Sequence, residues 1–198
     1  MKPIEEDNLI FTLRAMANGK EVAFRDFYSQ HYNTFIRFGK LVTSDLQLIE
    51  DAIQNILIWF IENPNKVSRL DRPDVYLFRS LRNNLIKDLN KSNKADINNL
   101  NQVVEDLIQS QSAETQWMEK ESEQIRNQQL QSEIANLPDY LQQTLYLRYF
   151  SNLSYNDIAN ILDIKPNVAR IYVHRAIERL RSVLTKIGVI IVVASNFF

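Results

Sequence analysis

Apolar residues recur every three or four positions along most of residues 1–92, which is the pattern of amphipathic helices. Four helices are predicted there, and each is bounded by a start or stop signal. Asn18-Gly19 ends the first, Ser44 caps the third, Pro64 stops the third, and Pro73 lies in the first turn of the fourth. The predicted helices cover residues 5–17, 21–42, 45–63 and 73–91, with a loop at 64–72.

The periodicity weakens from residue 92 to about residue 123. It returns toward the end of this polar segment, in the stretch over residues 117–137. Pro138 then opens a compact helix over 139–150. Ser154 and Asp157 have the spacing of a capping box for a helix over 155–162, and Pro166 lies in the first turn of a last long helix. The pattern predicts two helical segments joined by a polar linker.

Composition supports an all-α fold, because the 198 residues include only three Gly and five Pro. The chain has no Cys, so disulfides and thiolate metal sites are excluded, and with two His no metal centre is expected. The acidic start lacks an apolar signal segment, and the longest uncharged apolar run, at 189–198, is about half of a membrane span. We therefore expect a soluble, cytoplasmic protein.

Charge is distributed unevenly, although the net charge is only −1. Residues 66–94 carry +5 and residues 137–188 carry +3, whereas residues 1–65 carry −3 and residues 95–136 carry −6. Because salt screens charges beyond about 10 Å, the two basic zones can bind an acidic partner despite the acidic average.

The last long helix would present one apolar and one polar face. Ala169, Val173, Ala176 and Leu180 lie on the apolar side of a helical wheel. The opposite side carries five candidate DNA-binding residues: Asn167, Arg170, Ile171, His174 and Arg175. With the short break at 162–166, this pattern is typical of a helix-turn-helix unit, although an ordinary helical hairpin with a solvated basic face fits it equally.

Residues 137–182 resemble region 4 of bacterial RNA polymerase sigma factors of the extracytoplasmic-function type, within the sigma-70 family. The resemblance rests on Leu137-Pro138, "LRYF" at 147–150, "LSYNDIA" at 153–159 and "VHRAIERLR" at 173–181. "DAIQNILIWFIEN" and "YLFRSLRNNLIKDLNK" resemble the polymerase-binding and promoter-melting helices of region 2. The turn departs from the family, which usually has Gly at the position of Asp163, so promoter preference does not transfer.

The resemblance implies an all-α fold of two small domains joined by an acidic linker. Residues 1–92 would be region 2, residues 93–130 the flexible linker, residues 131–186 the region 4 helix-turn-helix domain, and residues 187–198 an apolar tail. The implied partners are promoter DNA and core RNA polymerase, through the clamp of its largest subunit and its flap region. An anti-sigma factor or another targeting partner is a further candidate, and neither a cofactor nor a small-molecule substrate is expected.

Two faces of region 2 receive separate roles. Opposite the buried stripe of the helix at 73–91 lie the predicted DNA-binding residues Tyr76, Arg79, Asn83, Lys87 and Lys91. On the helix at 45–62, the predicted polymerase-binding residues Asp51, Gln54, Asn55 and Ile58 share one side, away from an apolar stripe that includes Leu46. By resemblance, the loop at 65–72 captures a flipped base.

Two other function classes compete with the sigma-factor interpretation. A two-domain helix-turn-helix regulator would bind DNA without polymerase, but no alternating strand and helix pattern for a sensor domain is present. An enzyme acting on nucleic acid would need a phosphate loop or a catalytic cluster, and no such motif occurs, so no catalytic residue is predicted. The tail at 189–198 would pack on the protein, dock a partner or contact a membrane, in that order of expectation.

Overall fold

The computed structural model describes residues 6–92 and 130–187, and every regular element in these ranges is a helix. The all-α, two-domain layout predicted from the sequence is therefore confirmed. Apart from residues 130 and 187, the predicted linker at 93–130 and the predicted tail at 187–198 lie outside the described residues, so the expectations for them stay predictions. Within the described ranges, no helix combines the length and apolar character that a membrane span requires.

The N-terminal domain, residues 6–92, begins with α1 (Glu6–Ala17), α2 (Glu21–Asp26), the π-helical turn η1 (Phe27–His31) and α3 (Tyr32–Lys40). Three further helices follow: α4 (Leu46–Glu62), α5 (Pro64–Val67) and α6 (Pro73–Ser92). The segment from Glu21 to Lys40 is thus one continuous helical stretch with a π-helical turn, as the predicted helix at 21–42 required. The predicted loop at 64–72 was partly wrong, because α5 lies inside it.

Helix boundaries follow the expected local chemistry with one correction. Asp45, not Ser44, caps α4, because its carboxylate accepts a 3.0 Å hydrogen bond from the backbone N–H of Leu48. Gly19, just after α1, has a φ of +73° that an L side chain would adopt only at a cost.

The C-terminal domain, residues 130–187, begins with a helical turn at 130–135. It continues with α9 (Asp139–Leu145), the π-helical turn η2 (Tyr146–Phe150), α10 (Tyr155–Leu162) and α11 (Pro166–Ile187). The predicted capping box of α10 is present: Asp157 N–H donates to Ser154 Oγ at 3.2 Å, and the Ser154 N–H donates back to Asp157 Oδ2 at 3.3 Å. Asp163 ends α10 in the left-handed conformation, with a φ of 57°, so it takes the place that Gly usually fills.

The predicted apolar stripes form the core. Ile49, Ile53, Leu57 and Phe60 of α4 are buried, as are Phe78, Leu81 and Leu85 of α6 and Ala169, Val173, Ala176 and Leu180 of α11. Leu46 was expected in this core but is 45% exposed, because it lies in the first turn of α4, at the end of the bundle. Aromatic rings fill the centre of the N-terminal domain, where Phe78 packs on Phe35 at 4.6 Å between centroids and on Phe38 at 5.1 Å.

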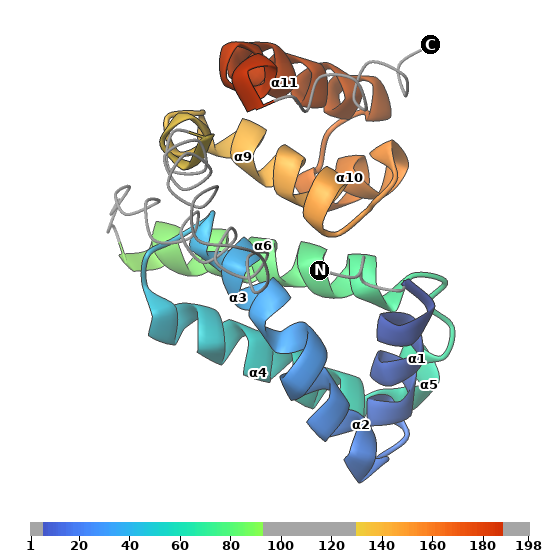
Figure 1. The fold of residues 1–198 in the computed structure, drawn as a ribbon. Helices are drawn as coiled ribbons and strands as arrows, with labels where there is room; N and C mark the ends of the chain where they lie inside the picture. The colour runs from blue at the N-terminus through green and yellow to red at the C-terminus, as the bar shows by residue number, and fades with distance from the viewer. Residues whose placement is uncertain (1–5, 93–129, 188–198) are drawn as a thin grey trace, which may run out of the picture.

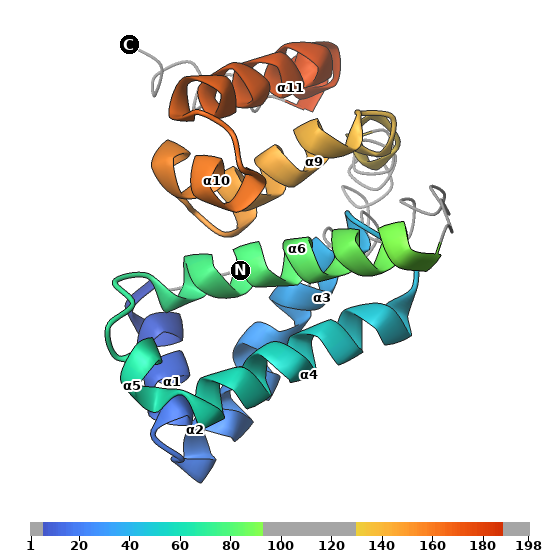
Figure 2. The same ribbon diagram turned by 180° about the vertical axis from the view of Figure 1, so that it is seen from behind.

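The two domains pack directly against each other. Helix α6 lies between the N-terminal bundle and the layer formed by α9 and α10, and α11 lies on the far side of that layer (Figures 1 and 2). One continuous apolar core includes residues of both domains, so the boundary between them is not a gap in packing. The ring of Tyr146 enters it from the C-terminal domain, 6.0 Å from the ring of Phe38.

Candidate nucleic-acid interface

The outer face of α11 presents the residues that the sequence analysis assigned to DNA. All five are exposed to solvent: Asn167, Arg170, Ile171, His174 and Arg175. Their opposite face is buried against α9 and α10, which anchors the helix. Ile171 is 44% exposed in the middle of this polar and basic face.

A stack of cations and an aromatic ring supports the start of this face. The guanidinium of Arg170 lies 5.3 Å from the centre of the Tyr155 ring, and that of Arg148 lies 4.9 Å from the same ring. Arg148 also donates a 2.9 Å hydrogen bond to the carbonyl of Leu153. Sequence reasoning missed Arg148 and Tyr155, because helical wheels treat one helix at a time and this stack joins η2, α10 and α11.

The predicted DNA-binding residues of α6 do not share one environment. Asn83, Lys87 and Lys91 are exposed, and Lys91 forms a 3.4 Å ion pair with Asp88. Tyr76 is half-buried and stacks on Trp59, with 4.9 Å between ring centres. Arg79 reaches across to α10, where its Nη1 donates a 2.9 Å hydrogen bond to Asn160 Oδ1. Four of the five side chains are therefore exposed, and one of these four, Arg79, also bonds to the C-terminal domain.

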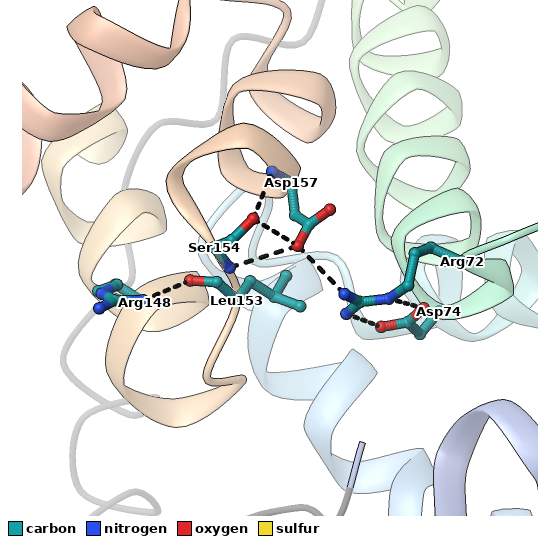
Figure 3. A network of polar contacts seen from close by, with 6 residues as sticks. All are labelled: Arg72, Asp74, Arg148, Leu153, Ser154 and Asp157. Atoms are coloured by element: carbon teal, nitrogen blue, oxygen red, sulfur yellow. Dashed lines mark hydrogen bonds and ion pairs between the residues drawn. The ribbon is translucent and has the colours of Figure 1, made fainter. Parts of the chain in front are cut away.

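Two further arginines, both half-buried, also bond to the C-terminal domain. Arg72, just before α6, donates to both carboxylate oxygens of Asp74, at 3.0 and 2.7 Å, and to Asp157 of α10 at 3.2 Å. Arg82 Nε donates to Gln143 of α9 at 3.1 Å. Figure 3 shows Asp157 between the capping residue Ser154 and Arg72, so one carboxylate both caps α10 and joins the two domains. The sequence indicated the cap but not this ion pair.

The predicted polymerase face of α4 is exposed as expected. Asp51, Gln54 and Asn55 face solvent, and Ile58 is 50% exposed beside them. Ile61, one turn further along, is 40% exposed, so this side of α4 carries aliphatic surface that the sequence analysis did not assign. Trp59 is half-buried, and its ring packs against the rings of Phe60 and Tyr76.

The described residues contain no cluster of three or more His, Cys, Asp or Glu side chains that could hold a metal ion. What the site offers is hydrogen-bond donors, cations and one exposed aliphatic side chain on α11, with a second set of donors on α6. These groups can bind phosphates and base edges.

Comparison with known families identifies the C-terminal domain. Residues 127–180 match the family model described as sigma-70, region 4. The match covers α9, η2, α10 and most of α11, the part of the chain that presents the exposed face of α11. A search of curated protein sequences finds no match. This stretch of the C-terminal domain is therefore similar to region 4 of the sigma-70 family, a family that acts in promoter recognition and transcription initiation.

Proposed function

We propose that this protein is a sigma factor of the extracytoplasmic-function type, which binds core RNA polymerase in the cytoplasm and directs promoter recognition, DNA melting and initiation. The single observation that carries the proposal is the exposed face of α11, which lies inside the stretch that matches region 4. Helix α11 is the second helix of a tight pair with α10. A complete capping box begins α10, and Asp163 in the left-handed conformation ends it and starts the turn to α11.

In this proposal α11 enters the major groove of the upstream promoter element. Arg170 and Arg175 neutralise phosphates, and Asn167 and His174 hydrogen-bond to base edges. Ile171 contacts the methyl group of a thymine, because this is the apolar group that the major groove offers to an exposed aliphatic side chain. Tyr155 positions Arg170 through its ring and does not itself contact a base.

Helix α6 acts on the downstream element. Asn83, Lys87 and Lys91 supply hydrogen bonds and positive charge on its exposed side. The stacked Tyr76 and Trp59 rings are both half-buried, so each keeps some surface on which an unpaired base can stack. Arg79 joins this set once it leaves Asn160.

The polymerase clamp would bind the exposed side of α4. Asp51, Gln54 and Asn55 place acidic and amide groups around the half-exposed Ile58. An apolar residue surrounded by polar groups is typical of the centre and rim of a protein interface. An acidic surface such as this side of α4 would repel the phosphates of DNA, so a protein partner is proposed for it.

Transcription in vitro with purified core polymerase tests the proposal. With the protein present, core polymerase should initiate at defined positions on genomic DNA fragments, and the two should co-elute as one complex. A regulator that binds DNA alone would bind fragments without core polymerase and form no such complex. Failure to associate with core polymerase would contradict the proposal. A variant with Ile171→Ala should still bind core polymerase but initiate less often at the same start sites.

A further inference from the structure

A groove lies where the chain just after α3, the end of α6 and the start of α9 meet. Its volume is about 590 Å³, and most of its wall is apolar, formed by Leu41, Val42, Ile86, Leu89, Pro138 and Tyr140. The charged side chains among its lining residues, Arg82 and Asp139, have opposite signs. A groove of this composition favours an uncharged, apolar ligand, because a charged ligand would lose hydration against the apolar wall.

The buried polar groups of the groove are already bonded within the protein. Gln143 is 7% exposed and donates a 3.0 Å hydrogen bond to the carbonyl of Leu41. The same side chain accepts a 3.1 Å hydrogen bond from Nε of Arg82, which is half-buried. Because these groups have partners in the protein, a ligand gains mainly from apolar burial in the groove.

Tyr140 extends this apolar surface to α11. Tyr140 lines the groove, and its ring also packs on the ring of Tyr172 of α11, with 4.6 Å between ring centres. Tyr140 is 40% exposed, and Tyr172 is half-buried. Accessible apolar surface therefore continues from α11 across the two rings to the groove.

The chain itself supplies a matching ligand directly after α11. Residues 188–198 contain no charged residue, and seven of these eleven residues are Val, Ile or Phe. The predicted linker begins close to the groove as well, but residues 95–136 carry a charge of −6. The tail therefore suits the apolar wall better than the linker does.

The tail is also long enough to reach the groove. Eleven extended residues span up to about 35 Å. Tyr172 lies fifteen residues before Ile187 at the end of α11, which is about 22 Å along the helix axis. The end of α11, the start of α9 and the end of α6 lie on the left in Figure 1 and on the right in Figure 2. A path from Ile187 to the groove therefore stays on one side of the molecule.

We propose that residues 188–198 bind along this surface and that Phe197 and Phe198 occupy the groove. The two rings replace water against Ile86, Leu89 and Tyr140, so that burial of apolar area drives the binding. Binding of the tail requires neither DNA nor core polymerase, so it does not depend on the proposed function.

Site-specific photo-cross-linking in the full chain locates the tail. p-Benzoylphenylalanine in place of Phe198 keeps an aromatic group at that position. On irradiation of dilute protein it should form intramolecular adducts with residues 41–42, 86–90 or 138–140, identified by mass spectrometry. The control carries the same group in place of Phe11, which is 67% exposed on α1 and does not line the groove. Its yield on the groove residues should be at least about tenfold lower, because it has no binding site there.

Three results of this experiment would overturn the proposal. Adducts confined to other parts of the same chain would place the tail elsewhere. Adducts that join two chains would make a second copy of the protein the ligand. Absence of any adduct from position 198 would show that the tail has no fixed binding site on the chain.

A pair of substitutions measures whether the tail and the groove stabilise each other. Phe197→Ser with Phe198→Ser should lower the urea midpoint of the otherwise unchanged chain. With Tyr140→Ala already present, the same tail change should lower the midpoint less than about half as much, because part of its binding surface is gone.

Tyr149→Ala provides the matched control for Tyr140→Ala. Tyr149 is 49% exposed on η2 and does not line the groove, so the tail change should keep its full effect in that background. Equal shifts of the urea midpoint in all three backgrounds would overturn the proposal, because the tail and the groove would then contribute independently.

Discussion

At the scale of single residues, the least expected feature is a buried histidine in the π-helical turn η1. His31 is 4% exposed, and neither ring nitrogen has a hydrogen-bond partner, although the ring of Phe27 lies 6.4 Å away. Burial lowers the pKa of His31, and the charge of Asp26 opposes this shift only in part. The ring is therefore held in its neutral form in the folded protein.

This environment predicts a loss of stability at mildly acidic pH. Because the pKa of His31 is lower in the folded state than its usual value of about 6.5, the unfolded chain binds more protons below that pH. The free energy of unfolding should fall as the pH drops from about 6.5 toward the folded pKa. His31→Phe should flatten this dependence, measured as urea midpoints at several pH values between about 5 and 7.5. An unchanged slope in the variant would assign the dependence to other groups.

A second residue-scale prediction concerns the contact of α3 with α4. A Cβ atom added at Gly39 would lie 2.5 Å from Cγ2 of Ile49, which is completely buried. Gly39→Ala should therefore destabilise the protein by about 1–3 kcal/mol, measured by urea unfolding, although alanine favours helices. Ile49→Ala removes the clashing atom, so the double variant should lose less stability than the sum of the two single variants. Strict additivity would show that the helices move apart instead.

At the scale of helices, each face follows from how the helix is packed. Helix α11 buries small and branched residues against α9 and α10, which leaves its polar side to solvent. Helix α4 buries one stripe in the N-terminal core and exposes a second side that mixes acidic, amide and aliphatic groups. Helix α6 is covered on two sides, by the N-terminal bundle and by α10, so only its remaining side is exposed.

The face of α11 should contribute a measurable electrostatic term to promoter binding. Arg170→Ala with Arg175→Ala removes two exposed cations from that face. The slope of log binding constant against log salt should become shallower by about 2, with weaker binding at low salt. Fluorescence anisotropy of a labelled promoter fragment at several salt concentrations measures this slope. Lys20→Ala with Arg25→Ala, two exposed cations at α2, is the control and should leave the slope unchanged.

The face of α4 should act on a protein and not on DNA. Asp51→Arg with Gln54→Ala should weaken binding to core polymerase at least about tenfold, because two groups at the proposed interface are reversed or removed. Both side chains are exposed, so the melting temperature should stay close to that of the parent protein. Biolayer interferometry with immobilised core polymerase gives the affinity. Undiminished affinity would place the polymerase contact on another surface.

At the scale of the whole molecule, one core connects domains that the sequence separates by a long linker. The connected residues range from Leu9 in α1 to Ala169 in α11. A smaller cluster of Leu137, Leu141, Leu145, Ala176 and Leu180 lies within the C-terminal domain alone. Shared burial of this kind makes the domains stabilise each other.

The shared core predicts a single cooperative unfolding transition. Far-ultraviolet circular dichroism reports helical structure in both domains, whereas the fluorescence of Trp59 reports the N-terminal domain alone. Both probes should nevertheless give the same urea midpoint. The measurement needs Trp117 replaced by Phe, so that Trp59 is the only tryptophan. Tyr146→Phe, which removes the bond to Thr34, should lower the stability by about 1 kcal/mol for both probes together. Two separate transitions would show that the domains unfold independently.

Local sequence signals determined most of the helices and their buried faces, because a helix needs only a 3.6-residue apolar period and suitable ends. The apolar faces of α4, α6 and α11 and the capping box of α10 were predictable for this reason. The exposed set on α11 followed as well, since the side opposite a buried stripe faces solvent unless another element covers it. The cap of α4 was assigned one residue early because Ser44 and Asp45 are both good capping residues.

Only the tertiary structure decided which element covers which side of a helix. A wheel of α6 places Arg79 on a polar face, but the bond to Asn160 joins residues 81 positions apart, and that between Arg72 and Asp157 spans 85 positions. The stack of Arg148, Tyr155 and Arg170 likewise joins three elements. Periodicity is a property of one segment, whereas these contacts depend on how separate segments pack. The free energy of that packing is summed over contacts in both domains, so no single segment determines it.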